Sequence, residues 1–173
     1  FFVSHPSWFL PPALRGYLLA KCMWDPNVNA GEVVEAFCRG YYGPAAEPIL
    51  TYIRESHDAM EAAGGELSIF GGPQDETAWL DETHYSRFDA LMEEALSAAA
   101  GSEIYSFRAK TAAMPIWYAG IVLGYGDRAV RLDRIGRFAA HARKLGLERV
   151  EEWTISPDMF ITDAIAALDN QGE

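Results

Sequence analysis

The chain has 173 residues, of which 50% are apolar and 13% aromatic, a composition that suits a packed domain and excludes a disordered chain. Its 25 acidic and 14 basic residues give a net charge of -11, so nucleic acid and anionic membranes would be repelled. No stretch approaches the roughly 20 consecutive apolar residues that a membrane-spanning helix requires.

The first twelve residues are rich in aromatic side chains and proline, and they predict an irregular lead-in over residues 1–12. The chain begins with Phe1 instead of an initiator Met, and no signal-peptide pattern follows. We therefore expect a piece of a longer polypeptide, in which the lead-in connects a missing upstream domain to a single helical domain at residues 13–170.

Apolar residues recur at helical spacing along most of residues 13–170, and proline, glycine and capping residues separate the periodic stretches. Short loops between them favour antiparallel neighbours. We predict an all-α fold, a bundle or array of about six to seven helices with at most one short extended segment. The expected helices span about residues 13–23, 30–42, 45–62, 83–99, 102–123, 127–145 and 157–168.

Several local signals set the expected helix ends and irregularities. Asn29 with Glu32 three positions later resembles a capping box at the start of the second helix. Pro115 lies inside the fifth helix and is expected to kink it. Residues 67–70 and 150–155 could be extended, but segments this short cannot found a sheet.

The residue types that bind metals are scattered along the sequence. The four histidines form no pair at metal-ligand spacing, and Cys22 and Cys38 form no Cys-x-x-Cys motif, so we expect no metal site. A disulfide between Cys22 and Cys38 is geometrically open, but two buried free thiols fit better.

No catalytic pattern is complete in the sequence. A Gly-x-Ser-x-Gly elbow, a phosphate-binding loop and a dinucleotide fingerprint are all missing, so we expect no cofactor and no catalytic residue. Adjacent acids such as Glu93-Glu94 face solvent more often than substrate. A glycosidase needs two carboxyl groups across a cleft, and the sequence predicts no strand framework to hold them.

Aromatic side chains are the more informative set, because their faces can stack on sugar rings, although core packing is the commoner use. We take Trp8, Trp24, Tyr41 and Tyr42 as candidate substrate-binding residues. Other aromatic residues that could stack in this way are Trp79, Trp117, Tyr118 and Trp153.

Two stretches carry a more specific pattern. Residues 14–27 read LRGYLLAKCMWDPN and residues 33–46 read VVEAFCRGYYGPAA. Together they resemble the 4838 domain-of-unknown-function family, and the strong resemblance covers about residues 13–60. Such domains occur in bacterial proteins that resemble glycoside hydrolases, and a similar pattern lies near the C-terminal regions of α-glucuronidases.

The resemblance implies a TIM-barrel catalytic domain upstream in the same polypeptide, with acid and base residues at the barrel's C-terminal face. No catalytic residue is carried over to this chain. Family habit also implies a periplasmic or extracellular location. The parent would be a glycoside hydrolase, whereas we expect the chain itself not to be catalytic.

Three hypotheses follow. The leading one is an accessory helical domain that supports the barrel and exposes an apolar docking patch around residues 1–24. The alternative is a self-standing carbohydrate-binding or protein-interaction module. The third, an independent all-α enzyme, has no support in the spacing of the His, Cys or acidic residues. Carbohydrate and a second copy of the chain stay open as partners.

Overall fold

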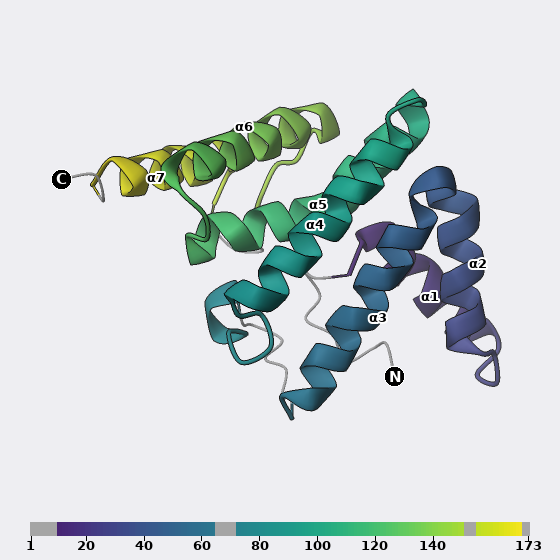
Figure 1. Cartoon of the computed structure of the whole chain (residues 1–173). Coiled ribbons are helices and arrows are strands. Elements are labelled where there is room, and N and C mark those ends of the chain that lie inside the picture. The colour runs from purple at the N-terminus through teal and green to yellow at the C-terminus, as the bar shows by residue number, and fades with distance from the viewer. Residues whose placement is uncertain (1–9, 65–71, 151–154, 171–173) are drawn as a thin grey trace. The chain divides into compact units, whose positions relative to one another are not determined.

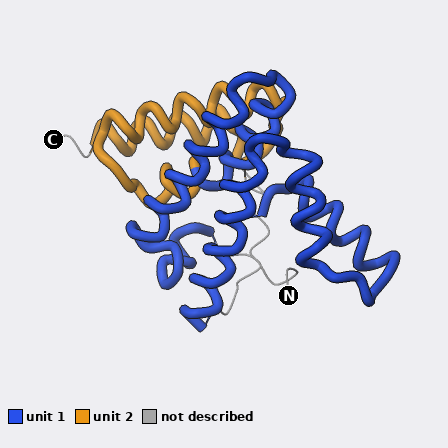
Figure 2. The backbone as a smooth tube through the Cα atoms, turned by 45° about the vertical axis from the view of Figure 1, so that its right-hand side comes forward, with its two compact units in different colours: residues 1–116 blue, residues 117–173 orange. Residues whose placement is uncertain are grey.

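The structure is a computed structural model that describes residues 10–64, 72–150 and 155–170. The chain divides into two compact units, Phe1–Ile116 and Trp117–Glu173, which Figure 2 colours separately. The described residues form seven α-helices and two short 3-10 helices and contain no strand (Figure 1). The predicted all-α fold is confirmed. The single domain over residues 13–170 and the lead-in over residues 1–12 stay predictions.

The observed helix bounds follow the predicted ones closely. The elements are α1 (Pro12–Trp24), α2 (Ala30–Tyr42), η2 (Gly43–Ala45), α3 (Ala46–Ala62), η3 (Pro73–Asp75), α4 (Glu82–Ala99), α5 (Glu103–Leu123), α6 (Arg128–Leu145) and α7 (Pro157–Asn170). Pro115 lies inside α5, and the kink expected there stays a prediction. Residues 67–70 and most of 150–155, which could have been extended, lie outside the described residues.

Side-chain caps explain where several helices begin and end. Asn29 caps α2, because its Oδ1 accepts hydrogen bonds from the backbone N–H groups of Gly31 and Glu32 at 3.0 and 3.4 Å. Its Nδ2 also donates to Glu32 Oε1 at 3.1 Å, a variant of the predicted capping box. Asp127 caps α6 in the same manner, and Gly146 ends that helix in a left-handed conformation.

In the first unit, α3 and α4 form an antiparallel pair (Figure 1). The rings of Tyr52 and Phe88 meet edge to face with centroids 5.5 Å apart. One turn away, Arg87 donates two hydrogen bonds of 2.8 Å to the carboxylate of Glu55 at the protein surface. Both helices contribute buried apolar side chains to the core. They include Ile49, Leu50, Ile53, Leu91, Met92 and Ala95.

The connection from α2 to α3 is a tight corner that packs against α5. Gly43 adopts a positive φ of 55°, which L-residues with a side chain rarely adopt. The Tyr105 ring of α5 lies directly over it, and a Cβ added at Gly43 would meet the ring at 2.5 Å. Both the turn and the close approach therefore require glycine at this position.

The second unit pairs α6 with α7, again antiparallel. Arg128 at the start of α6 binds Asp169 at the end of α7 at 2.7 Å, and Arg143 near the end of α6 lies 3.5 Å from Asp158 near the start of α7. Between them, Phe160 of α7 packs on aromatic rings of α5 and α6. The two ion pairs thus join the start of α6 to the end of α7 and the end of α6 to the start of α7, as an antiparallel arrangement requires.

A glycine-to-alanine comparison tests the corner. Gly43→Ala should lower the free energy of unfolding by about 2 kcal/mol more than Gly64→Ala. Gly64 also has a positive φ, of 70°, but no heavy atom of the described residues lies within 4 Å of an added Cβ there. Urea unfolding at constant m-value measures the difference.

A double-mutant cycle isolates the contact itself. The Tyr105 ring is what a Cβ at Gly43 would strike. Gly43→Ala should therefore cost less free energy of unfolding in a Tyr105→Ala background, with a coupling energy of about 1 kcal/mol or more. Equal losses for Gly43→Ala and Gly64→Ala, with no coupling to Tyr105, would show that the ring does not press on the corner.

Candidate functional site

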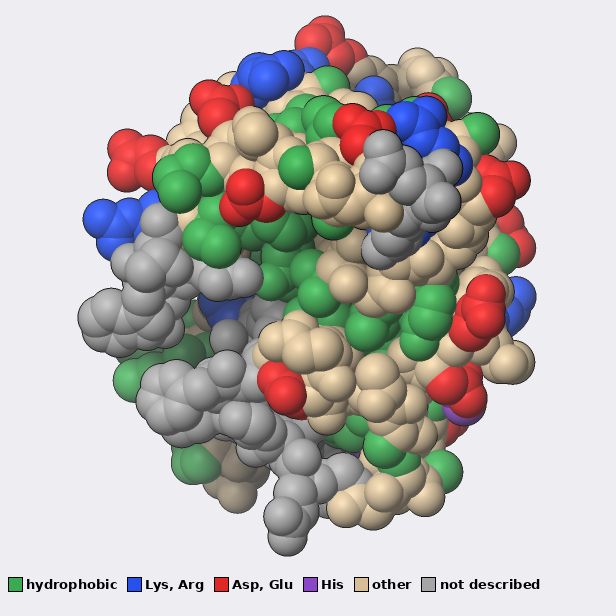
Figure 3. All heavy atoms as spheres, turned by 90° about the vertical axis from the view of Figure 1, so that its left-hand side faces the viewer, with side chains coloured by type: hydrophobic (Ala, Val, Ile, Leu, Met, Phe, Trp, Pro, Cys, Tyr) green, Lys and Arg blue, Asp and Glu red, His purple; other side chains and the backbone are tan. Residues whose placement is uncertain are grey.

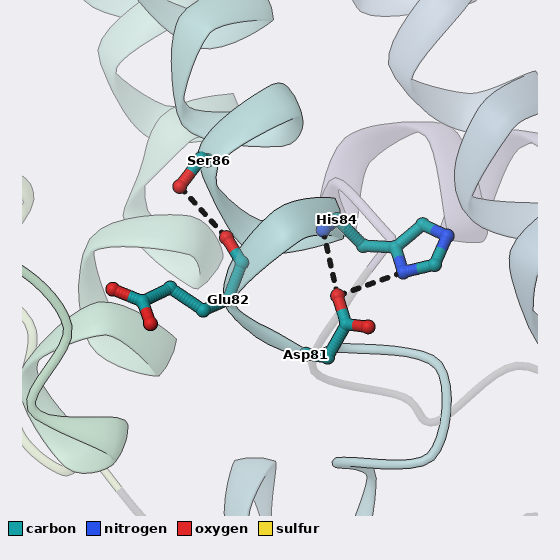
Figure 4. A network of polar contacts seen from close by, with 4 residues as sticks. All are labelled: Asp81, Glu82, His84 and Ser86. Carbon is teal, nitrogen blue, oxygen red and sulfur yellow. Dashed lines mark hydrogen bonds and ion pairs between the residues drawn. The ribbon is translucent and has the colours of Figure 1, made fainter.

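The start of α4 holds a polar network that invites comparison with a catalytic dyad (Figure 4). Asp81 Oδ1 accepts a hydrogen bond of 2.8 Å from the backbone N–H of His84, and Nδ1 of the His84 ring lies 2.9 Å from the same oxygen. The backbone N–H of His84 is the main cause that holds the pKa of Asp81 below its ordinary value. Asp81 is therefore the N-cap of α4.

Ser86, the hydroxyl residue in the same turn, does not complete this pair as a nucleophile. Ser86 donates its hydroxyl hydrogen bond to the backbone carbonyl of Glu82 at 2.7 Å. Figure 4 shows Ser86 and Glu82 on one side of the turn and the His84 ring on the other. A triad needs the serine hydroxyl on the imidazole, whereas the Ser86 hydroxyl points to Glu82, so these four residues form a helix cap.

Two searches of the described residues bear on other classes of site. No group of three or more His, Cys, Asp or Glu side chains in the described segments could hold a metal ion. None of the described helices combines the length and the apolar character needed to cross a bilayer.

The four candidate substrate-binding aromatics fall into different environments. Trp24 is 91% exposed at the end of α1, whereas Tyr41 is half-buried and Tyr42 is 1% exposed. Trp8 lies outside the described residues. Only the Trp24 ring among the three described candidates is open to a sugar, because stacking needs a free ring face.

Tyr41 belongs to a row of side chains that crosses α1, α2 and α5. The Tyr17 and Phe37 centroids are 5.1 Å apart, and Phe37 stacks on Tyr41 at 4.9 Å. A cation lies at each end of the row, with Lys21 Nζ 5.5 Å from the Tyr17 centroid and Arg108 Cζ 4.2 Å from that of Tyr41. We call these five residues the cation-capped row.

The row's α5 end fixes the corner described above. Arg108 Nη1 donates a 2.9 Å hydrogen bond to the backbone carbonyl of Tyr41 while its guanidinium covers the Tyr41 ring. Phe37 and the edge-on ring of Tyr42 pack on the same ring. With three neighbours around it, the Tyr41 ring contributes to packing of the fold, and cation–π contacts of this kind add about 0.5–2 kcal/mol each.

Burial also makes two polar groups near the corner chemically inert. Desolvation raises the pKa of the Tyr42 phenol far above its ordinary value and that of the Cys38 thiol to about 12. Cys38 is fully buried and Cys22 half-buried, and both are free thiols. The expectation of free thiols is confirmed, whereas the expected burial of Cys22 is only partial.

The remaining aromatic candidates also serve packing where the structure describes them. Trp79 is buried, and its Nε1 donates a 2.6 Å hydrogen bond to the carboxylate of Glu76. Tyr118 packs against Phe160 with centroids 5.3 Å apart. Trp117 is buried, and Trp153 lies outside the described residues.

The surface of α1 away from α2 is the most unusual feature of the first unit. Leu14 and Leu18 bury one side of the helix. The opposite side carries no charged residue and consists of exposed apolar or small side chains, which we call the α1 outer face. Its members are Ala13, Gly16, Leu19, Ala20, Met23 and Trp24.

This face is more apolar than an ordinary solvated helix surface. Leu19, Met23 and Trp24 are 50%, 78% and 91% exposed. Figure 3 shows what a mixed surface looks like, with acidic side chains spaced singly among apolar ones on the face it draws. Contiguous exposed apolar side chains commonly mark an interaction site. The apolar exposure predicted around residues 1–24 is thus present on α1.

Residues 10–55 match the family described as Domain of unknown function (DUF4838). We call residues 10–55 the DUF4838 segment. The resemblance found in the sequence is thereby confirmed over these residues. No curated protein and no solved structure matches the chain.

The DUF4838 segment runs from just before α1 to the middle of α3. It therefore contains the α1 outer face and most of the cation-capped row. Sequence reasoning missed Arg108 and Tyr105, which hold the row and the corner from α5. They lie some sixty residues beyond the corner, and no spacing or motif in the sequence connects them to it.

Thiol labelling tests the burial of Cys38. At pH 8 a thiol with a pKa of about 12 is ionised in about one molecule in ten thousand, so only Cys22 should react readily in the native protein. Cys22→Ser should abolish that reaction, and denaturant should then release one further thiol. Rapid labelling of native Cys22→Ser would mean that Cys38 is not buried.

The pH dependence of stability tests the α4 cap. The pKa of Asp81 is lowered on folding from its ordinary value of 3.8, so its stabilisation is complete above that value and is lost as the pH falls through the lower folded pKa. Asp81→Asn keeps a capping side chain that does not titrate. The stability advantage of the wild type over Asp81→Asn should shrink below about pH 4, and a constant difference from pH 2 to 7 would contradict the assignment.

Proposed function

We propose that this chain is a non-catalytic helical module of a carbohydrate-active enzyme, and that it docks on a TIM-barrel domain of the same polypeptide through the α1 outer face. The observation that carries the proposal is the pair of opposite apolar sides on α1. One side is buried by Leu14 and Leu18, and the other exposes Leu19, Met23 and Trp24. An apolar side of a helix is normally packed against another element.

Two further points support the proposal. The other residues of the DUF4838 motif already have structural roles, since Tyr41, Tyr42 and Gly43 build the corner. The polar network most like a catalytic site is a helix cap at Asp81. The family's occurrence in glycoside-hydrolase-like proteins supplies the barrel and the carbohydrate substrate as the expected context.

Hydroxyl-radical footprinting tests the docking. Radicals oxidise exposed Met and Trp side chains, so Met23 and Trp24 report directly on the α1 outer face. In the complete polypeptide that the gene encodes, both should be oxidised about tenfold more slowly than in this 173-residue chain, because apolar surface is buried on docking. Met159, which is exposed on α7, provides an internal reference. Equal oxidation of Met23 and Trp24 in the two proteins would reject the docking role.

A self-standing carbohydrate-binding module is the second candidate, and the exposed ring of Trp24 is the observation that favours it. Calorimetry of this chain against a panel of oligosaccharides separates the two. The docking proposal predicts no binding to the isolated chain and no hydrolysis of aryl glycosides by it. Sugar binding that Trp24→Ala abolishes would favour the module instead.

A further inference from the structure

The shape of the α1 outer face restricts what can cover it. Gly16 and Ala20 are one turn apart and form a low strip in its centre, while Leu19 and Met23 stand along one edge and Trp24 at the C-terminal end. A narrow strip between taller side chains accepts a ridge of the kind that a single helix presents. Small residues at the contact let two helix axes approach to about 8 Å.

Gly16 itself is not explained by the first unit. A Cβ added there would meet no heavy atom of the described residues within 4 Å, and its φ is an ordinary helical one. Glycine inside a helix costs about 1 kcal/mol relative to alanine. Glycine at this position would let the backbone of another helix approach the outer face closely.

Charge restricts the occupant further. Arg15 lies beside Leu19 at one border of the face, and Lys21 lies beside Trp24 at the other. Helix α1 carries these two basic residues and no acidic one, although acidic residues outnumber basic ones by 25 to 14 in the chain. Two copies of the chain would each carry a net charge of -11 and would repel each other. Pairing of the two α1 outer faces would also bring basic residues close to basic residues, so self-association is disfavoured.

We infer that α1 is covered by a helix whose own apolar stripe is bordered by Asp or Glu side chains. The inference rests on the docking proposed above and specifies its partner surface. An outer helix of a TIM barrel supplies such an element, because the helices form the outside of that fold. A carboxylate along its edge would face Lys21 and help to orient the two helices.

Two substitutions in the complete polypeptide test the inference, with footprinting of Met23 and Trp24 as the readout. Gly16→Leu fills the central strip and should raise their oxidation by about tenfold. Gly40→Leu, at an exposed helical glycine of α2 that also has no described heavy atom within 4 Å of an added Cβ, is the matched control and should change it little. Circular dichroism of each variant checks that the helices are intact.

Lys21→Glu should raise the oxidation by about threefold at low salt, and the effect should fade near 0.5 M salt, because exposed charge pairs are weak and screened. Lys110→Glu, at an exposed lysine of α5, is the control for net charge. If Gly16→Leu raises the oxidation of Met23 and Trp24 but Lys21→Glu does not, the partner helix has no acidic border facing α1.

Protection of Met23 and Trp24 that neither substitution changes would overturn the helical partner while leaving the docking intact. Absence of protection in the unsubstituted complete polypeptide would overturn both the docking and this inference. The two failures are therefore distinguishable.

Discussion

The packing of the α2–α3 corner against α5 is the constraint on which the first unit depends. Gly43 lets the chain reverse and lets the Tyr105 ring lie against the backbone, while Arg108 holds the Tyr41 carbonyl and covers its ring. These contacts join residues more than sixty positions apart in the sequence. They fix the direction in which α3 leaves the corner, and α3 in turn forms the antiparallel core pair with α4.

This constraint changes how the DUF4838 segment is understood. The two tyrosines of its Tyr-Tyr-Gly-Pro motif pack within the fold, because Tyr42 is buried and the Tyr41 ring lies against Phe37 and Tyr42. What the segment leaves for interaction is the α1 outer face. Tyr17 connects the two parts, since its ring extends the cation-capped row from α2 onto α1.

Local signals were sufficient to predict the helices. Asn29 acts through neighbouring backbone groups, so its effect is readable within a few residues, and the observed cap agrees. The apolar exposure near the first helix was also predictable, because the apolar residues of α1 are too many to lie on one buried side of the helix. The roles of Tyr41 and Tyr42 were not, since the same aromatic letters serve a sugar platform or a core. The contact of Tyr41 with Arg108 and the burial of Tyr42 are set by residues far away in the sequence.

We propose that α1 needs cover on two sides and receives it on one within the first unit. Native-state amide hydrogen exchange of this chain measures that directly. We expect the free energy of opening for α1 amides to be at least about 2 kcal/mol lower than for amides of α3, whose apolar side is fully packed. Equal protection of α1 and α3 would contradict it, because a helix as stable as the core would need no further partner.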